Sequence, residues 1–473
     1  MIAAGLAIGC GPTPQYTCAQ DDQCRLSGEE DGACIAGECA YPDPSCDSTL
    51  RYPDLARPEF AGACVPIPGS TGSTSQPPDT SSTSTAPETG TTGSSTETVG
   101  STATGNPTTS TGPAPGCEVV RIDGGDAHTC ALSGGDVWCW GLNDNLQLGF
   151  EGPSTSVPMR VPLARGAVTG LGIIGDDHGC AVVGDDEIWC WGEQNNTNVD
   201  GVSGPGPLPP TRLDINSPHH LSAGENFSCA ALTPNVTCWG DTFWGQTGTV
   251  GGTGFNSILA GVEVDLLVSG GLHSCVRTAS AGTLRCWGSD DHGQLGRGTT
   301  VTGRPNPQPD PMPPVGLPGS VDAVELGSAL SCVLVEGRTW CWGRETSEQL
   351  LSAGTSSTPV SLDAVPDATE VSVGGQFVCV RTDAGTVHCW GSNGDGQSDP
   401  LSPRTGDGVL DTTLALSSVL GAQPVARALG TGEAHACMLT DDAVICWGRN
   451  DDGQLGDQAV SATVARVSLP GCE

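Results

Sequence analysis

The sequence contains no lysine, few aromatic residues and no long apolar segment. All 18 basic residues are Arg, set against 54 Asp and Glu, so the formal net charge is −36, and aromatic residues make up 4%. Affinity for nucleic acid or for anionic lipid comes from clustered Lys and Arg, so this charge argues against both kinds of partner. After residue 10 no run of 18 or more apolar residues occurs, and we expect no transmembrane helix.

Glycine and cysteine, by contrast, are abundant, with 69 Gly and 23 Cys among 473 residues. Glycine at about twice its ordinary frequency indicates a turn-rich β protein rather than a helical bundle. So many cysteines would be a liability in a reducing cytosol, and we therefore expect an exported, oxidised protein.

Residues 1–10, MIAAGLAIGC, are small and mostly apolar and end at Cys10. The segment is similar to the end of a bacterial lipoprotein signal, in which the cysteine is lipidated after cleavage. It departs from that pattern because a positive n-region is missing and Ala7 stands where Leu is usual. We expect a lipid anchor at Cys10; the alternative is an ordinary cysteine in an apolar N-terminus.

Residues 11–65 form a small cysteine-rich module. About 55 residues cannot fold on a hydrophobic core alone, so three disulfides are expected to stabilise them. The sequence does not choose among the fifteen possible connectivities. A zinc module is the rival interpretation, but the segment has no His and no CxxC spacing. The six cysteines are Cys18, Cys24, Cys34, Cys39, Cys46 and Cys64.

Residues 66–116 are expected to be a disordered linker. From Pro66 to Pro115, 25 of 50 residues are Ser or Thr, with no Arg and no aromatic residue. Such a composition buries too little apolar surface to offset the entropy of ordering. The linker would act as a stalk between the N-terminal module and a large domain.

Residues 117–473 contain an internal repeat marked by the tripeptide Cys-Trp-Gly. Successive copies are 51, 48, 48, 55, 48 and 57 residues apart. A period near 50 with strand-like patterning is typical of a β-propeller with one blade per copy. The seven copies begin at Cys139, Cys190, Cys238, Cys286, Cys341, Cys389 and Cys446.

Copies such as GTGEAHACMLTDDAVICWGRNDDGQLG resemble the repeat of the regulator-of-chromosome-condensation family. The resemblance implies an all-β fold, a seven-bladed propeller of four-stranded blades. The namesake's activity, guanine-nucleotide exchange with chromatin docking, is the least favoured function. Residues 117–473 hold 15 Arg against 41 Asp and Glu and have no basic tail.

A second cysteine precedes each Cys-Trp-Gly and predicts one disulfide per blade. With Gly134-Gly135 as a two-residue turn, Cys130 faces Cys139 at a non-hydrogen-bonded site, where the Cα separation suits a disulfide. Metal binding by His-x-Cys is disfavoured because Phe227, Leu330 and Phe377 replace the His while both cysteines stay. The expected pairs are Cys130–Cys139, Cys180–Cys190, Cys229–Cys238, Cys275–Cys286, Cys332–Cys341, Cys379–Cys389 and Cys437–Cys446.

Cys117 and Cys472 lie at the two ends of the repeat array. The segments beside them match strands found on either side of the inter-copy connection, so we expect one blade to be assembled from both chain ends. A Cys117–Cys472 disulfide would then close the ring. With six cysteines in the module and fourteen in the hairpins, this leaves Cys10 as the odd residue.

Few residues are candidates for ligand contact. The repeated His and the seven Trp of Cys-Trp-Gly are best explained by strand and blade packing. Trp244 lies outside the repeat pattern and is a candidate contact residue, as are the adjacent His219 and His220 in a Pro-flanked loop. Irregular loops on a regular propeller are where we expect binding. No catalytic motif, metal site or cofactor site is expected.

We therefore expect a monomeric, non-enzymatic lipoprotein of the cell envelope, in the outer membrane or secreted, whose propeller binds a protein or a glycan. The alternative is a propeller enzyme, a lyase or hydrolase that uses the central channel. Nucleic acid is excluded as a partner, and contact with membrane is expected only through the lipid anchor.

Overall fold

The computed structural model describes residues 33–35, 38–42 and 50–51 and most of residues 119–469. The gaps within the last range are residues 165–167, 174–176, 185, 195–196, 202–205, 253, 300–305, 352–353, 364, 402–411, 414–415, 421, 442 and 458–463. Cys10, the linker 66–116, Cys117 and Cys472 lie outside the described residues, as do Cys18, Cys24, Cys46 and Cys64 of the N-terminal module.

The chain divides into two units, Met1–Gly105 and Asn106–Glu473. In the first, β1 (Ala33–Ile35), β2 (Glu38–Pro42) and β3 (Leu50–Arg51) form an antiparallel sheet in which Cys34 lies opposite Cys39. Within the described residues, no helix is both long and apolar enough to cross a membrane.

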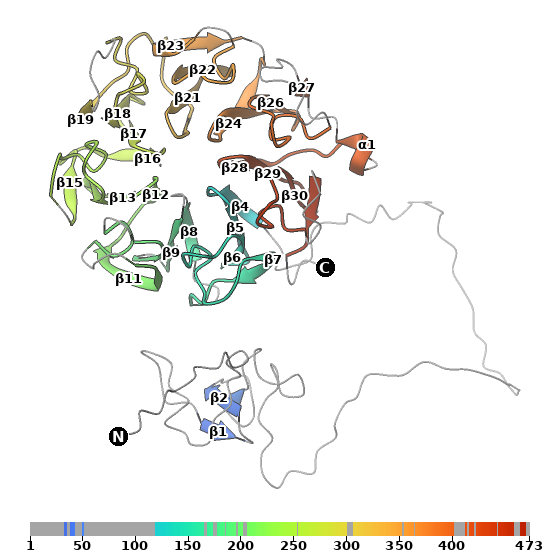
Figure 1. The fold of residues 1–473 in the computed structure, drawn as a ribbon. Coiled ribbons are helices and arrows are strands. Elements are labelled where there is room, and N and C mark those ends of the chain that lie inside the picture. The colour runs from blue at the N-terminus through green and yellow to red at the C-terminus, as the bar shows by residue number, and fades with distance from the viewer. Residues whose placement is uncertain are drawn as a thin grey trace, which may run out of the picture. The chain divides into compact units, whose positions relative to one another are not determined.

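The second unit is a ring of seven four-stranded antiparallel sheets in its described part (Figure 1). The prediction of an all-β, seven-bladed propeller is confirmed. Blades 1 to 3 hold the first twelve strands of the ring. Blade 1 comprises β4 (Val119–Gly124), β5 (His128–Ser133), β6 (Asp136–Gly141) and β7 (Thr155–Arg160); blade 2, β8 (Val168–Ile173), β9 (His178–Val183), β10 (Glu187–Gly192) and β11 (Leu208–Asn216); blade 3, β12 (His220–Ala223), β13 (Phe227–Leu232), β14 (Asn235–Gly240) and β15 (Asn256–Ile258).

Blades 4 to 7 complete the ring. Blade 4 comprises β16 (Val264–Ser269), β17 (His273–Thr278), β18 (Leu284–Ser289) and β19 (Pro307–Met312); blade 5, β20 (Ala323–Leu326), β21 (Leu330–Val335), β22 (Arg338–Gly343) and β23 (Ser356–Leu362). Blade 6 comprises β24 (Ala368–Val373), β25 (Phe377–Thr382), β26 (Val387–Gly391) and β27 (Thr412–Thr413), followed by α1 (Ser417–Leu420); blade 7, β28 (Ala428–Thr431), β29 (His435–Leu439), β30 (Val444–Gly448) and β31 (Val464–Val467).

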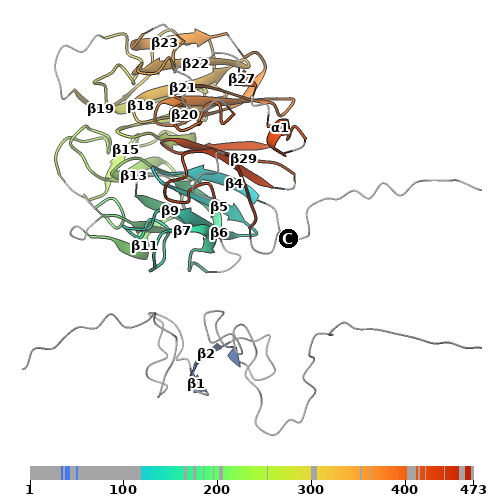
Figure 2. The ribbon, with the colours of Figure 1, turned by 45° about the vertical axis from the view of Figure 1, so that its right-hand side comes forward.

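The prediction that one blade is assembled from both chain ends is wrong. Every blade is built from four consecutive strands, so β31 is the outer strand of blade 7 and β4 the inner strand of blade 1. The two matching sequence segments flank the inter-copy connection, and that connection runs from the outer strand of one sheet to the inner strand of the next. The ring closes by packing of blade 7 (red) against blade 1 (cyan) (Figures 1 and 2).

The hairpin register in each blade is the one that the cysteine spacing predicts. Cys130 pairs with Cys139, and Ser133 with Asp136 beyond it, leaving Gly134-Gly135 as the turn with both φ angles positive. All seven predicted hairpin disulfides are formed in the described part of the chain, with Cα–Cα separations of 4.0–4.2 Å.

Each disulfide lies inside the interface between two blades. The cluster joining blades 1 and 2 contains Cys130, Cys139 and, from blade 2, Trp191, all at most 1% exposed. The same composition recurs in the other six clusters, including the one that joins blade 7 to blade 1 through Trp140. Side-chain alternation along the third strand produces this arrangement, since it sends the cysteine and the following tryptophan to opposite faces of the sheet.

Hydrogen bonds from the seven buried indoles also join neighbouring blades. Each Nε1 donates to a backbone carbonyl of the preceding blade, at 2.8–3.0 Å, which confirms that these tryptophans serve blade packing. The donor and acceptor residues are Trp140 and Gln454, Trp191 and Gln147, Trp239 and Asn198, Trp287 and Gln246, Trp342 and Gln294, Trp390 and Gln349, and Trp447 and Gln397.

Candidate functional site

The propeller has two faces with different connections. The turns between first and second strands and the loops between third and fourth strands lie on one face, which we call the loop face. The second-to-third hairpin turns and the inter-blade connections lie on the other, which we call the hairpin face. This division follows from the up-and-down order of four antiparallel strands in each blade.

The loop face is built from Asn and Gln side chains that hold the backbone. In blade 1, Asn143 Oδ1 accepts the Leu148 N–H at 3.0 Å, and Gln147 Oε1 accepts the Asn145 N–H at 2.8 Å. Both amide side chains are buried. The repeated Gln-Leu-Gly segment is therefore structural, and it leaves the other loop positions free to vary.

The loop face is strongly acidic in its described part. It carries 18 carboxylates against three arginines, and its one ion pair between described residues is Arg449–Asp451, at 3.0 Å. The carboxylates are Asp126, Asp144, Glu151, Asp177, Glu193, Asp200, Glu225, Asp241, Asp290, Asp291, Glu345, Glu348, Asp395, Asp399, Glu433, Asp451, Asp452 and Asp457, and the arginines are Arg297, Arg344 and Arg449.

The negative charge of the hairpin face and of the strand ends beside it is neutralised in part by ion pairs. Described ion pairs there include Arg160–Asp136 at 2.9 Å, Arg277–Asp265 at 2.8 Å and Arg427–Asp441. In the described part of the propeller, the excess of carboxylates over arginines is therefore larger on the loop face than elsewhere.

Burial and mutual repulsion both act on the loop-face carboxyls. Burial, followed by repulsion from the nearby Glu193 and Asp126, raises the pKa of Asp177 to about 6. The pKa of Glu225 is raised by burial and then by Asp241 and Glu433. A positively charged partner would relieve this repulsion.

An apolar patch interrupts the acidic face on the blade 3 loop between β14 and β15. Phe243, Val250 and Phe255 are 56%, 54% and 42% exposed. The rings of Phe243 and the half-buried Trp244 meet edge to face, with centroids 5.0 Å apart. We call Phe243, Trp244, Val250 and Phe255 the aromatic patch.

The loop backbone fixes the patch in place. The Phe243 N–H donates to Asp241 Oδ1 at 2.9 Å, and the Trp244 N–H to Gln246 Oε1 at 2.8 Å. The Phe255 ring packs over Gly201 of the blade 2 loop. A Cβ added to Gly201 would lie 2.5 Å from this ring, so the contact requires glycine there. Phe255 thus joins the blade 3 loop to the loop of blade 2.

The three candidate contact residues are not brought together. Trp244 lies on the loop face, in the aromatic patch. His219 and His220 lie at the hairpin-face end of blade 3, where they line the central channel; His219 Nε2 bonds to Thr233 Oγ1, and burial lowers the pKa of His220. The sequence pattern does not point to Phe243, Val250 and Phe255; for Phe243, the DTFWG segment that also holds Trp244 is the available signal.

Three of the four repeated histidines bond to the next blade. His178 Nε2 lies 2.9 Å from Ser228 Oγ, His273 Nε2 lies 2.8 Å from Ser331 Oγ, and His435 Nε2 lies 2.8 Å from Thr129 Oγ1. Burial lowers the pKa of each, to about 4, about 3 and about 4 respectively, so these imidazoles are neutral. Their role is structural, as the sequence predicts.

Comparisons with known proteins agree with this architecture. Residues 119–147, 264–294 and 368–397 match the regulator of chromosome condensation (RCC1) repeat, as does the segment 134–182. Human E3 ubiquitin-protein ligase HERC2 is 29% identical over 364 residues, which is 71% of this chain and 7% of HERC2. Ultraviolet-B receptor UVR8 of Arabidopsis thaliana is 26% identical over 258 residues, 50% of this chain and 55% of UVR8. The chain thus spans a small part of one relative and about half of the other.

Solved structures show the same fold. Yeast RCC1 (Prp20), in its complex with Kap60, superposes with a TM-score of 0.61 at 16% identity, covering 79% of this chain and 92% of that one. Human WBSCR16 gives 0.59 at 19% identity, covering 71% and 95%. The blades and their interfaces define a propeller assembled from one repeated unit. The segments matched in blades 1, 2, 4 and 6 are RCC1 repeats, and the chain is a seven-bladed propeller with a disulfide in each blade of the described part.

Proposed function

We propose that this chain is a non-enzymatic binding module that recognises a basic protein through the loop face of its propeller. The observation that carries the proposal is the aromatic patch within a surface that has 18 carboxylates and three arginines in its described part. Aromatic anchors surrounded by a polar, charged rim are the usual anatomy of a protein interface. The irregular loops that carry this surface stand on a rigid, disulfide-bonded ring.

The disulfides support a location in an oxidising compartment outside the cytosol. A lipid anchor at Cys10, followed by a module and a long linker, would hold the propeller at a distance from the membrane. That arrangement fits an envelope or surface receptor, and the RCC1-repeat relatives show that the same scaffold serves proteins of different activities.

The test uses the full chain and two matched variants. Phe243→Ala/Trp244→Ala removes the centre of the patch, and Val425→Ala removes a side chain that is 62% exposed on the hairpin-face side between blades 6 and 7. Proteins captured from an envelope extract are compared for the wild type and both variants, at low salt and at 300 mM salt.

We expect basic proteins that bind the wild type and Val425→Ala, are lost with the double variant, and are released by salt. A captured set that is the same for all three proteins would contradict the proposal. Retention that depends on sugar, abolished by periodate treatment of the extract, would contradict it in favour of a glycan ligand.

A further inference from the structure

The propeller encloses a central channel with a cavity of about 520 Å³, lined by the first strands of the blades. Alternation along these strands turns every second residue towards the channel. Its charged and titratable lining includes Arg121 and Asp123 from blade 1, His220 from blade 3, Glu325 from blade 5 and Glu370 from blade 6.

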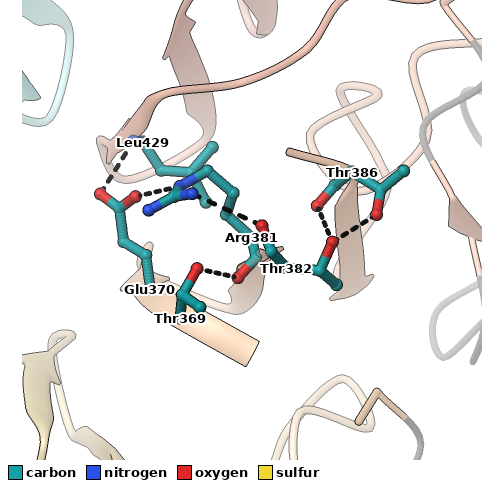
Figure 3. A network of polar contacts seen from close by, with 6 residues as sticks. All are labelled: Thr369, Glu370, Arg381, Thr382, Thr386 and Leu429. Carbon is teal, nitrogen blue, oxygen red and sulfur yellow. Dashed lines mark hydrogen bonds and ion pairs between the residues drawn. The ribbon is translucent and has the colours of Figure 1, made fainter. Parts of the chain in front are cut away.

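The Glu370 carboxylate is already hydrogen-bonded to other residues around the channel. One carboxylate oxygen accepts from Arg381 Nε at 2.7 Å, and the other from the Leu429 N–H of blade 7 at 3.0 Å (Figure 3). Arg381 in turn is held by Thr382 O, so this group links blades 6 and 7. Glu370 therefore has a structural role and little free capacity for a ligand.

Asp123 and Glu325 differ from Glu370. Asp123 has Arg121 beside it at 3.4 Å, and that guanidinium is itself 51% exposed. Glu325 accepts from the backbone of Leu326 and has no ion-pair partner in the described part of the chain. The two carboxyls occupy equivalent positions, each two residues before the turn glycine, on blades 1 and 5, which lie on opposite sides of the ring.

Electrostatics shows that the two carboxyls share a single positive charge, that of Arg121, which acts on both of them. Burial above all, together with repulsion from Asp123 and against the attraction of Arg121, raises the pKa of Glu325 to about 8. Burial raises the pKa of Asp123 to about 6, against the opposing effect of Arg121. At neutral pH the Glu325 carboxyl is thus mainly protonated, and a bound cation could neutralise its ionised form instead.

The rest of the lining favours an organic cation. The half-buried Leu266 and Val268 of blade 4 add apolar surface to the lining. The described residues contain no group of three or more His, Cys, Asp or Glu arranged to hold a metal ion. The hairpin-face end, with the exposed Arg121 and Val120, is the open approach.

The loop-face end is narrowed by backbone hydrogen bonds between the turns of adjacent blades. The Gly271 N–H donates to Gly327 O at 3.2 Å, the Gly375 N–H to Glu433 O at 3.1 Å and the Glu433 N–H to Gly125 O at 3.2 Å. A Cβ on Gly270 would lie 2.3 Å from Gly327 O, so the chain needs glycine there to draw the turns together.

We propose that the central channel binds a small aliphatic amine, with its ammonium group between Asp123 and Glu325 and its methylene chain against Leu266 and Val268. The ammonium donates hydrogen bonds to both carboxylates, and the proton of Glu325 leaves to the solvent, so the charge of the cavity is balanced before and after binding. This site is separate from the loop face and does not depend on the proposed protein partner.

The experiment is calorimetric titration of the full chain with n-butylamine at pH 7 in phosphate and in MOPS, which have different ionisation enthalpies. We expect saturable binding to one site, with a heat that differs between the buffers by close to one released proton. Glu325→Gln should weaken binding at least tenfold and abolish the buffer dependence. Glu263→Gln, an exposed substitution before β16, is the matched control and should leave both unchanged.

Equal melting temperatures of the two variants and the wild type would show that Glu325→Gln is folded. Absence of saturable heat in the wild type, or equal affinity in wild type and Glu325→Gln, would overturn the proposal. Binding of Ca²⁺ or Mg²⁺ that is lost in Glu325→Gln, without binding of the amine, would also overturn it in favour of a metal site.

Discussion

His128 is the one repeated histidine without the hydroxyl partner that its counterparts have. Both of its ring nitrogens are buried and lack a hydrogen-bond partner among the described residues. For the other histidines the hydroxyl comes from the next blade, from the residue directly after the one at the histidine position, as Ser228 follows Phe227. For His128 the corresponding residue of blade 2 is Gly179, which has no hydroxyl. Phe227 and Phe377 hold the same position in blades 3 and 6, so His128→Phe introduces a side chain that the fold already accommodates there.

The expected gain at neutral pH comes from removing an unpaired buried polar group. Such a group costs about 1–3 kcal/mol, so His128→Phe should be more stable than the wild type by about that amount. The matched variant His178→Phe loses a bonded imidazole instead, and Ser228 Oγ keeps its hydrogen bond to Asn198 O at 3.2 Å. We expect His178→Phe to be about 1 kcal/mol less stable than the wild type.

Acid should enlarge the advantage of His128→Phe. Burial, with smaller repulsion from His435 and His178, lowers the pKa of His128 from 6.5 to about 3. Below about pH 6.5 His128 therefore binds a proton in the unfolded chain but stays neutral in the folded chain. Because this difference favours unfolding, the contribution of His128 to stability is complete above pH 6.5 and is lost as the pH falls. The loss is about 1.4 kcal/mol per pH unit, or about 2 kcal/mol at pH 5, and a phenylalanine does not suffer it.

The assay is urea unfolding of the oxidised full chain at pH 7.5 and at pH 5. We expect the unfolding free energy of His128→Phe relative to wild type to be positive at pH 7.5 and about 2 kcal/mol larger at pH 5. A variant that is less stable than the wild type at pH 7.5, or a difference that does not change with pH, would refute this account of the blade 1–blade 2 interface.

Two further predictions concern the inter-blade clusters. Cys275→Ser/Cys286→Ser should lower the unfolding free energy by about 2–3 kcal/mol. Dithiothreitol should leave this disulfide of the native wild type oxidised because both sulfurs are buried. Thiol labelling of the dithiothreitol-treated native protein that matches the unfolded control would contradict this. Trp342→Phe removes the Nε1 bond to Gln294 O and should cost at least about 1 kcal/mol more than Trp340→Phe, whose indole nitrogen has no hydrogen-bond partner in the described contacts; equal costs in urea unfolding would count against the ring of indole bonds.

Much of the fold is predictable because the repeat is local. The spacing of Cys379 and Cys389 gives a three-residue turn, and the structure has that turn with Gly385 at φ 74°. Glu336-Gly337 likewise forms the predicted two-residue turn. Strand pairing within a hairpin depends on residues a few positions apart, so one sequence contains the information.

Assignment of strands to blades was less predictable. Similarity among copies identifies β31 and β4 as strand segments but does not say which sheet each joins. That choice is made by packing between blades 7 and 1, where Ile122 and Val467 are buried in one cluster. Contacts between chain ends are not visible in a repeat pattern.

The functional sites were predictable only in part. Trp244 was identifiable because it broke the repeat, whereas Val250 and Phe255 became a patch only through the path of the loop. Asp123 and Glu325 are charged residues in largely apolar first strands, and their relation across the channel appears only when the ring closes.

Hydrogen exchange of the full chain, alone and with a partner captured through the loop face, is the most direct test of the central claim. We predict that the partner slows exchange in residues 241–255 and in the neighbouring blade 2 loop at residues 197–201. Exchange at the hairpin turns Gly134-Gly135 and Glu336-Gly337 should stay unchanged. Protection of the hairpin turns, with no change in residues 241–255, would contradict the assignment of binding to the loop face.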